Sequence, residues 1–509
     1  MVLSIIVFAP MLFALMIALW PQASTIRPLS LGLSIIYFLG SLVVLRDFDQ
    51  TSSALQFAEQ YPWIERFGIT YFLGMDGISV MLVMLTNFLM PIMILGAWKS
   101  IEDRVRGFHV ALFVLQGAML GSFLAMDAVL FYVFWELSLV PMYFIIGIWG
   151  GSRRIYATIK FFIFTMAGSL LMLLAIIFMM HLTPEVTGGT MSASLLDFYK
   201  LKIPFIAGEF FTPQTLLFFA FALAFAIKVP IFPLHTWLPD AHVEAPTPGS
   251  VVLAGVMLKM GTYCFLRWVI PLFPDAAANY AWLFITLGLI GIVYGALVAM
   301  IQPDVKKLVA YSSVSHMGYI IVGLFVMNSY GMTGALYQML NHGISTGALF
   351  LLIGMIYERT HSRDISKYGG LASALPIYTI VFVIVTLSSI AVPMTNGFIG
   401  EFLILLGAFQ SHIGIAAVAV SGVVLGAAYM LWMIKKVFFG PKGEIVLEAE
   451  KDPSHHLHDM NWRELVVMAP LVVMIFWMGL FPNQFLNFSK ASLDHLLQNK
   501  TNYSLAIKQ

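Results

Sequence analysis

Charged residues are scarce in this chain of 509 residues: Lys, Arg, Asp and Glu make up 10% of it, whereas soluble domains carry about 25%. The net charge of +1 excludes the strongly basic field that nucleic-acid binding requires, so we expect no nucleic-acid partner. A single cysteine, Cys264, excludes an internal disulfide and a metal cluster held by cysteines. The N-terminus has neither a positively charged start nor a small-residue cleavage site, so we interpret residues 2–20 as a membrane helix and not as a removed signal.

Apolar residues, by contrast, make up 60% of the chain, and the mean hydropathy is +0.89. A membrane helix needs about 20 mostly apolar residues. By this criterion the sequence predicts an all-α membrane protein with fourteen transmembrane helices and no soluble domain. The predicted spans are 2–20, 28–46, 71–98, 108–126, 128–149, 158–180, 213–239, 247–271, 279–301, 305–327, 332–357, 374–409, 412–438 and 464–482.

Two of these spans, helices 7 and 12, are interrupted by the same dipeptide, Val229-Pro230 in one and Val392-Pro393 in the other. Proline removes a backbone donor, and lipid cannot satisfy the freed carbonyl, so such breaks must face protein or water. Paired breaks five spans apart are typical of inverted-repeat transporters, although each could be a packing kink. We expect helices 1–3 in 1–107, a first five-helix repeat (helices 4–8) in 108–271, a second inverted five-helix repeat (helices 9–13) in 279–438, and a loop, helix 14 and a C-terminal tail in 439–509.

Lysine and arginine are distributed unevenly between the two sides that fourteen spans define. Seventeen fall on the odd-numbered connections and eight on the side that holds both termini. Because cytoplasmic loops are enriched in these residues, the imbalance predicts a multi-pass protein with both termini outside the cytoplasm. Lys306 and Lys307, at the start of a span, are expected to be anchors on the cytoplasmic side.

Four ionisable residues lie deep inside apolar spans: Glu136, Lys228, Lys259 and Glu401. Each is about eight residues or more from a span end, roughly 12 Å at 1.5 Å per residue. A charge at this depth costs a few kcal/mol even on a lenient scale, so these side chains must face a polar or hydrated interior. Structural ion pairs are the alternative interpretation.

Lysine and glutamate at such positions can carry protons. Burial lowers the pKa of a lysine and raises that of a glutamate, and a nearby opposite charge reverses the shift. A transmembrane force of about 200 mV amounts to roughly 4.6 kcal/mol per charge, which a pKa swing of about three to four would match. We predict that Glu136 and Lys228 form a tuning pair, that Lys259 is the central carrier and that Glu401 is the carrier on the exit side.

Histidines can relay protons because their pKa lies near neutrality. His316 and His342 are the preferred candidates, since both lie in spans between Lys259 and Glu401. His235 and His242 follow the break in helix 7. Each of the four histidines could instead be a hydrogen-bonded residue of the core.

Four stretches carry a resemblance to a known family: FWELSLVPMYFIIGIWGG, KVPIFPLHTWLPDAHVEAPTPGSVVLAGVMLKMGTY, VAYSSVSHMGY and LYQMLNHGISTGALFLLIGMIYERT. They resemble the antiporter-like proton-pumping subunits of respiratory complex I, the NADH:quinone oxidoreductase, and the resemblance covers nearly the whole chain. It implies fourteen helices with two inverted five-helix repeats. The glutamate of the family's fifth helix falls on Glu136, the lysine of its broken seventh helix on Lys228, and the lysine of its eighth helix on Lys259.

The twelfth span distinguishes members of this family, because most carry a lysine there. Glu401 in that position, and the absence of a long C-terminal lateral helix, are similar to the subunit M (chain 4) type. The resemblance implies no cofactor in this chain: NADH, FMN, iron–sulfur clusters and quinone are expected on partner subunits. We expect no metal; a surface metal site in the stretch 440–463, which contains His455 and His456, is a weaker alternative to a solvated loop.

The resemblance predicts a proton-translocating subunit of an NADH:quinone oxidoreductase in a bacterial inner membrane, coupling quinone reduction in partner subunits to outward proton transfer. Expected partners are the other membrane subunits, especially the two related L and N types, and the lipid bilayer. A subunit of a multisubunit sodium/proton antiporter is the alternative, and a non-pumping scaffold subunit is a third. A related hydrogenase or another quinone-linked complex could also hold such a subunit.

Overall fold

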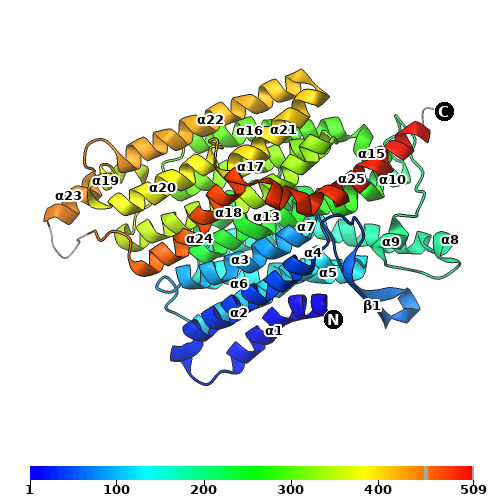
Figure 1. Cartoon of the computed structure of the whole chain (residues 1–509), viewed down its shortest axis with the longest axis horizontal. Helices are drawn as coiled ribbons and strands as arrows, with labels where there is room; N and C mark the ends of the chain where they lie inside the picture. Colours follow the sequence, from blue (N-terminus) through cyan, green and yellow to red (C-terminus); the bar gives the residue numbers. More distant parts are fainter. Residues whose placement is uncertain (452–456, 507–509) are drawn as a thin grey trace.

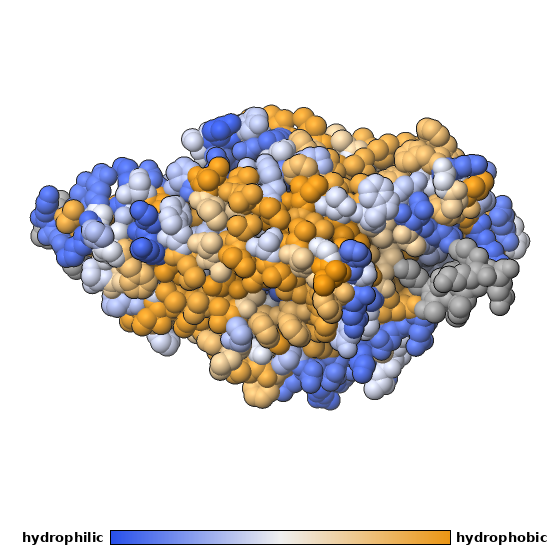
Figure 2. Space-filling model, turned by 90° about the horizontal axis from the view of Figure 1, so that it is seen from above, coloured by the Kyte–Doolittle hydropathy of each residue, from blue (hydrophilic) through white to orange (hydrophobic). Residues whose placement is uncertain are grey.

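In this computed structural model, residues 1–451 and 457–506 are described. The apolar spans fold as helices that lie side by side in one bundle, roughly along its long axis (Figure 1). Apolar residues gather around the middle of the bundle, and hydrophilic residues gather mainly at its two ends (Figure 2). Among the described residues, eleven helical runs are long and apolar enough to cross a membrane, and three further apolar helices are shorter. Each of these elements overlaps one of the predicted spans.

The N-terminal region holds three helices and a hairpin that the sequence did not predict. The expected third span, 71–98, is wrong at its start, because residues 71–75 belong to a strand and the helix begins at Val80. The strand is rich in β-branched and aromatic residues, which favour extended backbone, and Tyr61 pairs with Tyr71 across the hairpin. The elements are α1 (Val2–Leu19), η1 (Ala23–Thr25), α2 (Ile26–Asp47), β1 (Gln56–Ile64), η2 (Glu65–Phe67), β2 (Ile69–Met75) and α3 (Val80–Gly96).

The next region contains the first broken helix, as predicted, and a second break that was not. The expected span 213–239 is interrupted between Lys228 and Trp237, around Pro230. The elements are α4 (Val105–Leu124), α5 (Ala128–Leu137), α6 (Leu139–Trp149), α7 (Arg154–Leu182), α8 (Pro184–Thr187), α9 (Leu195–Phe198), α10 (Pro213–Lys228), α11 (Trp237–Glu244), α12 (Thr247–Val252), η3 (Leu253–Met257), α13 (Leu258–Cys264), η4 (Phe265–Val269) and α14 (Ile270–Leu272).

The unpredicted break separates α5 from α6 at Ser138, two residues after Glu136. Pro141 explains it, because a proline leaves the carbonyl four residues earlier, that of Leu137, without its helical donor and clashes with it. The span 247–271 is continuous but contains two π-helical turns, η3 and η4, on either side of α13. Such turns are frequent at functional sites.

The last region contains the second broken helix, interrupted between Ser389 and Asn396 around Pro393. The C-terminal tail, for which the sequence predicted no structure, forms the helix α25. The elements are α15 (Pro274–Asn279), α16 (Ala281–Met300), α17 (Val305–Phe325), α18 (Ser329–Thr360), η5 (Ile365–Lys367), α19 (Leu371–Ala374), α20 (Pro376–Ser389), α21 (Asn396–Ser411), α22 (Ile413–Phe438), α23 (Glu444–Lys451), α24 (Trp462–Leu480) and α25 (Asn483–Ala506).

Three helical runs form the centre of the bundle. The runs 247–272 and 329–360 are wholly buried over their most apolar stretch, and the run 305–325 is 94% buried there. Six of the other runs, on the outside of the bundle, are buried over only 28–39%. The fold therefore places Lys259, His316 and His342, one on each of the three runs, in the most buried part of the bundle.

Candidate functional site

Lys259 and His342 meet in the centre of the bundle. Lys259 lies on α13 and is 0% exposed, and its ammonium donates a hydrogen bond to the carbonyl of Ala254 in the π-helical turn η3. The same Nζ atom lies 2.6 Å from Nδ1 of His342 on α18. The sequence predicted a buried lysine here. The contact with the imidazole could not be predicted, because it joins residues 83 positions apart.

His316 and Glu401 form the next contact. His316 Nδ1 on α17 lies 3.1 Å from Glu401 Oε1 on α21, and both residues are buried. The imidazoles of His316 and His342 are edge to face, with ring centroids 5.7 Å apart. Lys259, His342, His316 and Glu401 thus follow one another in space, and we refer to these four residues as the central row.

A small polar cavity adjoins the central row. It has a volume of about 10 Å³ and is lined by His316, His342, Gln338, Asn341 and Ser345, among others. This is about the room that one water molecule needs. Nε2 of both histidines and Oδ1 of Asn341 are buried and have no hydrogen-bond partner in the described part of the chain. The arrangement provides polar groups through which a proton can pass between the two imidazoles.

Lys228 and Glu136 lie at the other end of the buried charges. Lys228 is the last residue of α10, is 1% exposed, and its ammonium has no hydrogen-bond partner in the described residues. It faces two aromatic rings, with Nζ 5.2 Å from the ring centroid of Trp135 and 5.8 Å from that of Phe161. Such cation–π contacts are worth about 2 kcal/mol when desolvated.

Glu136 is next to Trp135 on α5, and its Oε1 atom is buried without a partner. No ion pair within 4.0 Å joins Glu136 to Lys228 among the described residues, so the predicted tuning pair is not a closed salt bridge here. Lys228 is close to the helix of Lys259: a Cβ added at Gly261 would lie 3.2 Å from Cβ of Lys228 and 2.6 Å from Val229 Cγ2. Gly261 therefore allows the end of α10 to pack directly on α13.

Two further residues with ionisable side chains, His242 and Lys306, are also buried. His242 is fully buried and stacks on Phe350 with ring centroids 4.7 Å apart, and neither ring nitrogen has a hydrogen-bond partner within residues 1–451 and 457–506. It is therefore not a hydrogen-bonded core histidine. Lys306 is 8% exposed and its Nζ donates to the carbonyl of Ala245 at 2.6 Å. The assignment of Lys306 to the cytoplasmic side stays a prediction; its side chain is buried because the C-terminal carbonyls of α11 attract a cation.

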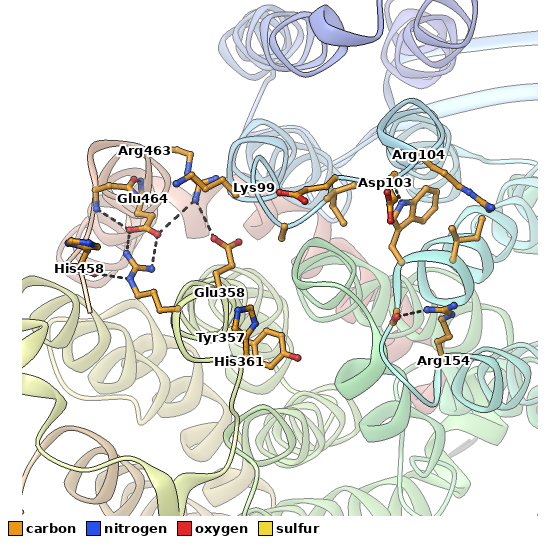
Figure 3. Close-up of a pocket in the computed structure, with 18 of the residues that line it drawn as sticks. Lys99, Asp103, Arg104, Arg154, Tyr357, Glu358, His361, His458, Arg463 and Glu464 are labelled. Carbon is orange, nitrogen blue, oxygen red and sulfur yellow. Dashed lines mark hydrogen bonds and ion pairs between the residues drawn. The ribbon is translucent and has the colours of Figure 1, made fainter. Parts of the chain in front are cut away.

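A separate pocket of about 1070 Å³ opens where α18, α24 and the loops around Lys99 and Trp149 meet (Figure 3). On one side of it the guanidinium of Arg359 donates two hydrogen bonds, of 2.9 and 2.6 Å, to the buried carboxylate of Glu464. Tyr357 on its wall is 15 residues from His342 along α18, roughly 22 Å at 1.5 Å per residue. This pocket is therefore distinct from the central row. The Arg359–Glu464 pair beside it holds the ends of α18 and α24 together.

A metal site finds no support in the described residues, where no group of three or more His, Cys, Asp or Glu side chains could hold an ion. His455 and His456, which the weaker metal alternative involved, lie outside the described residues.

Comparison with known proteins identifies the family. A family described as "NADH:quinone oxidoreductase/Mrp antiporter, TM" matches residues 125–426. NADH-quinone oxidoreductase subunit M of Rhodobacter capsulatus is 46% identical over 505 residues, which are 98% of this chain and 96% of that protein. The chain belongs to this family.

Two solved structures share the fold of this member of the NADH:quinone oxidoreductase/Mrp antiporter family. A chain of respiratory complex I from Thermus thermophilus with bound NADH is 31% identical, with a TM-score of 0.85 and coverage of 97% of this chain and 99% of that one. A chain of the Mrp complex from Dietzia is 20% identical with a TM-score of 0.82, covering 98% of each chain, and at this identity it shows the shared fold alone.

Proposed function

We propose that this chain is the proton-translocating subunit M of an NADH:quinone oxidoreductase. The observation that supports this best is the central row, in which the buried side chains of Lys259, His342, His316 and Glu401 follow one another on α13, α18, α17 and α21. The redox chemistry belongs to partner subunits, which carry NADH, FMN, iron–sulfur clusters and quinone. Quinone reduction there drives protons outward along the buried residues here.

The free energy of moving a proton can be supplied at Lys228. The ammonium of Lys228 faces two aromatic rings and has no carboxylate within 4.0 Å among the described residues. A carboxylate that approached to about 4 Å would stabilise it by about 4 kcal/mol at an effective dielectric constant of 20. Moving one charge against about 200 mV requires roughly 4.6 kcal/mol. The approach and withdrawal of Glu136 would therefore be nearly enough to load and unload one proton, and Lys259, His342, His316 and Glu401 would carry it on.

The architecture behind this mechanism is fourteen spans with two inverted repeats. Supporting this, two aspartates play the same local part. Asp127 caps α5 by accepting from the backbone N–H groups of Val129 and Leu130, and Asp304 caps α17 by accepting from those of Lys306 and Lys307. Each aspartate also forms an isolated bridge with a segment that follows a later helix, Asp127 with Ser194 and Asp304 with Asp364. The repeats would be 108–271 and 279–438, each with one helix broken at a Val-Pro step.

Both termini would lie on the outer side of a bacterial inner membrane. The excess of lysine and arginine on the odd-numbered connections supports this orientation. In Figure 1 the start of α1 and the end of α25 both lie in the right-hand half of the bundle, which is consistent with an even number of spans. Partners on the flanks would be the related L- and N-type subunits, and lipid would cover the remaining apolar surface.

Proton pumping by the reconstituted complex tests the proposal. We expect Glu136→Ala, Lys228→Ala and Lys259→Ala each to lower NADH-driven pumping about tenfold or more while the complex still assembles. Lys435→Ala, which removes an exposed lysine, is the control and should pump normally. Normal pumping by Lys259→Ala would mean that the chain is a scaffold, and a requirement for sodium would favour the antiporter.

A further inference from the structure

The side chain of Gln338 connects Glu401 to the interior of α18. Gln338 is 2% exposed, and its Nε2 donates to Glu401 Oε1 at 3.1 Å. Its Oε1 accepts from Nδ2 of Asn341 at 3.0 Å. Both the NH₂ and the oxygen of this amide are thus hydrogen-bonded, and the bonds to Glu401 and Asn341 fix its orientation. The orientation suits an ionised Glu401, since a carboxylate can only accept hydrogen bonds.

A second orientation is available to the same amide. When a proton passes from Nδ1 of His316 to Glu401 Oε1, the imidazolium becomes a neutral imidazole and the carboxylate becomes a neutral acid with one O–H donor. That O–H first donates back to Nδ1 of His316, which lies 3.1 Å away. When Nδ1 takes up its next proton, the O–H needs another acceptor, which Gln338 supplies by turning its amide over to present Oε1. Its NH₂ would then face Nδ2 of Asn341, so the Asn341 amide turns as well and presents its Oδ1, which is buried and has no partner among the described residues in the present arrangement. The unused oxygen of Asn341 is what the turned amide requires.

The network continues from Asn341 to the break in the second broken helix. Nδ2 of Asn396, the first residue of α21, lies 3.5 Å from the carbonyl of Asn341. Asn396 Oδ1 accepts from Oγ of Ser388 near the end of α20, at 2.5 Å. Ser345 on α18 bonds to Ser388 with their Oγ atoms 2.6 Å apart. Hydrogen bonds therefore span the break and join both halves of the helix to α18.

The backbone is shaped to bring these amides close to Glu401. A Cβ added at Gly400 would lie 2.3 Å from Gln338 Oε1 and 2.7 Å from Asn341 Nδ2. Real Cβ atoms do not approach so closely, so only glycine at this position lets α21 lie directly against the two amides.

We propose that Gln338 and Asn341 form an amide switch, in which Gln338 turns over when Glu401 gains or loses its proton and passes the change to the break between α20 and α21. They are positioning residues that act through Glu401. This inference rests on the proposed function, because it assigns Glu401 a proton that comes and goes.

A double-mutant cycle tests whether Gln338 acts through Glu401. Gln338→Met keeps the side-chain length and removes both amide groups, and we expect it to lower the protons pumped per NADH about fivefold to tenfold. Glu401→Met should lower them at least as much, and the double variant should pump no less than Glu401→Met, because residues that act as one unit are not additive. Gln302→Met is the matched control, since that amide bonds only to the carbonyl of Val298, and it should pump normally.

Infrared spectroscopy gives a readout that a merely structural role would not move, and it needs no variant of Gln338. The complex labelled with glutamine carrying ¹³C in its side-chain carbonyl should show a shifted amide band in the NADH-induced difference spectrum, and Glu401→Met should abolish that band. Wild-type pumping by Gln338→Met, additive losses in the cycle, or no labelled band would each overturn the switch. If Lys259→Ala pumps normally, the proposed function itself fails; if Lys259→Ala stops pumping and the labelled band is absent, only the switch fails.

Discussion

Replacing Lys259 with methionine should separate stability from function. Methionine has a similar length and fills the same space, but it removes the ammonium that is 0% exposed at the centre of the bundle. Burying an ammonium ion costs several kcal/mol even after relaxation. The two hydrogen bonds it makes, to Ala254 O and His342 Nδ1, contribute about 1–3 kcal/mol each when their loss leaves a buried acceptor. The two effects are similar in size and opposite in sign.

We therefore expect the Lys259→Met complex to assemble and to remain within about 2 kcal/mol of the wild type, while proton pumping is lost. Arg267→Met on the same helical run is the contrasting variant. It leaves the buried carboxylate of Asp76 without the guanidinium that lies 2.5 Å away, and removing one partner of a buried pair costs about 3–5 kcal/mol.

The assay is the thermal midpoint of the purified complex, followed by intrinsic tryptophan fluorescence, together with pumping in proteoliposomes. The midpoint should fall clearly for Arg267→Met and hardly at all for Lys259→Met. The reasoning would be refuted if Lys259→Met lowered the midpoint as much as Arg267→Met, because Lys259 would then be a structural residue.

Three further substitutions probe other parts of the structure. Gly400→Ala should lower pumping several-fold, since its Cβ would displace the amides of Gln338 and Asn341, whereas Gly426→Ala has nothing within 4 Å and should pump normally. Glu464→Ala should destabilise the complex to heat by about 3–5 kcal/mol by leaving Arg359 unpaired, and Glu464→Gln should cost less because Gln keeps the capping box with Asn461; equal midpoints for the two would contradict this account. Burial raises the pKa of Asp127, so its ionised form lowers stability once the pH exceeds the ordinary value of 3.8, and the loss is complete above the raised value. Asp127→Asn keeps the helix cap through Oδ1 but sets an NH₂ against the backbone N–H of Thr70, which donates to Oδ2 at 2.8 Å, so its midpoint should lie below wild type. Because the ionised wild type is the less stable form, this deficit should be larger near pH 4.5 than at pH 7; an equal deficit at both pH values would contradict the assignment.

The features of the fold that could be predicted depend on one stretch of sequence each. Apolar runs of about 20 residues locate the spans, and a proline within a run locates a break, as at Pro230 and Pro393. Glu136, Lys228, Lys259 and Glu401 could be selected as candidate site residues because a charge deep in an apolar run is costly and must face a polar or hydrated interior. The hairpin at 56–75 was missed because its second strand is apolar and directly precedes an apolar helix, so that hydropathy alone could not separate them.

The features that could not be predicted join residues far apart in the sequence. Nothing near Gln338 shows that it bonds to Glu401, 63 residues away, or that Lys306 reaches the carbonyl of Ala245. The same holds for Arg359 and Glu464, which come together only when α18 and α24 pack. A buried partner can be identified from the sequence only when one residue alone violates the apolar pattern, and short polar side chains such as Asn341 do not.

The number of protons moved per NADH oxidised tests the central claim most directly. Measured in proteoliposomes with the wild type and Lys259→Met side by side, the account predicts a clear fall in this ratio for the variant, with the complex fully assembled. An unchanged ratio in an assembled Lys259→Met complex would show that protons do not pass through the buried row of this subunit.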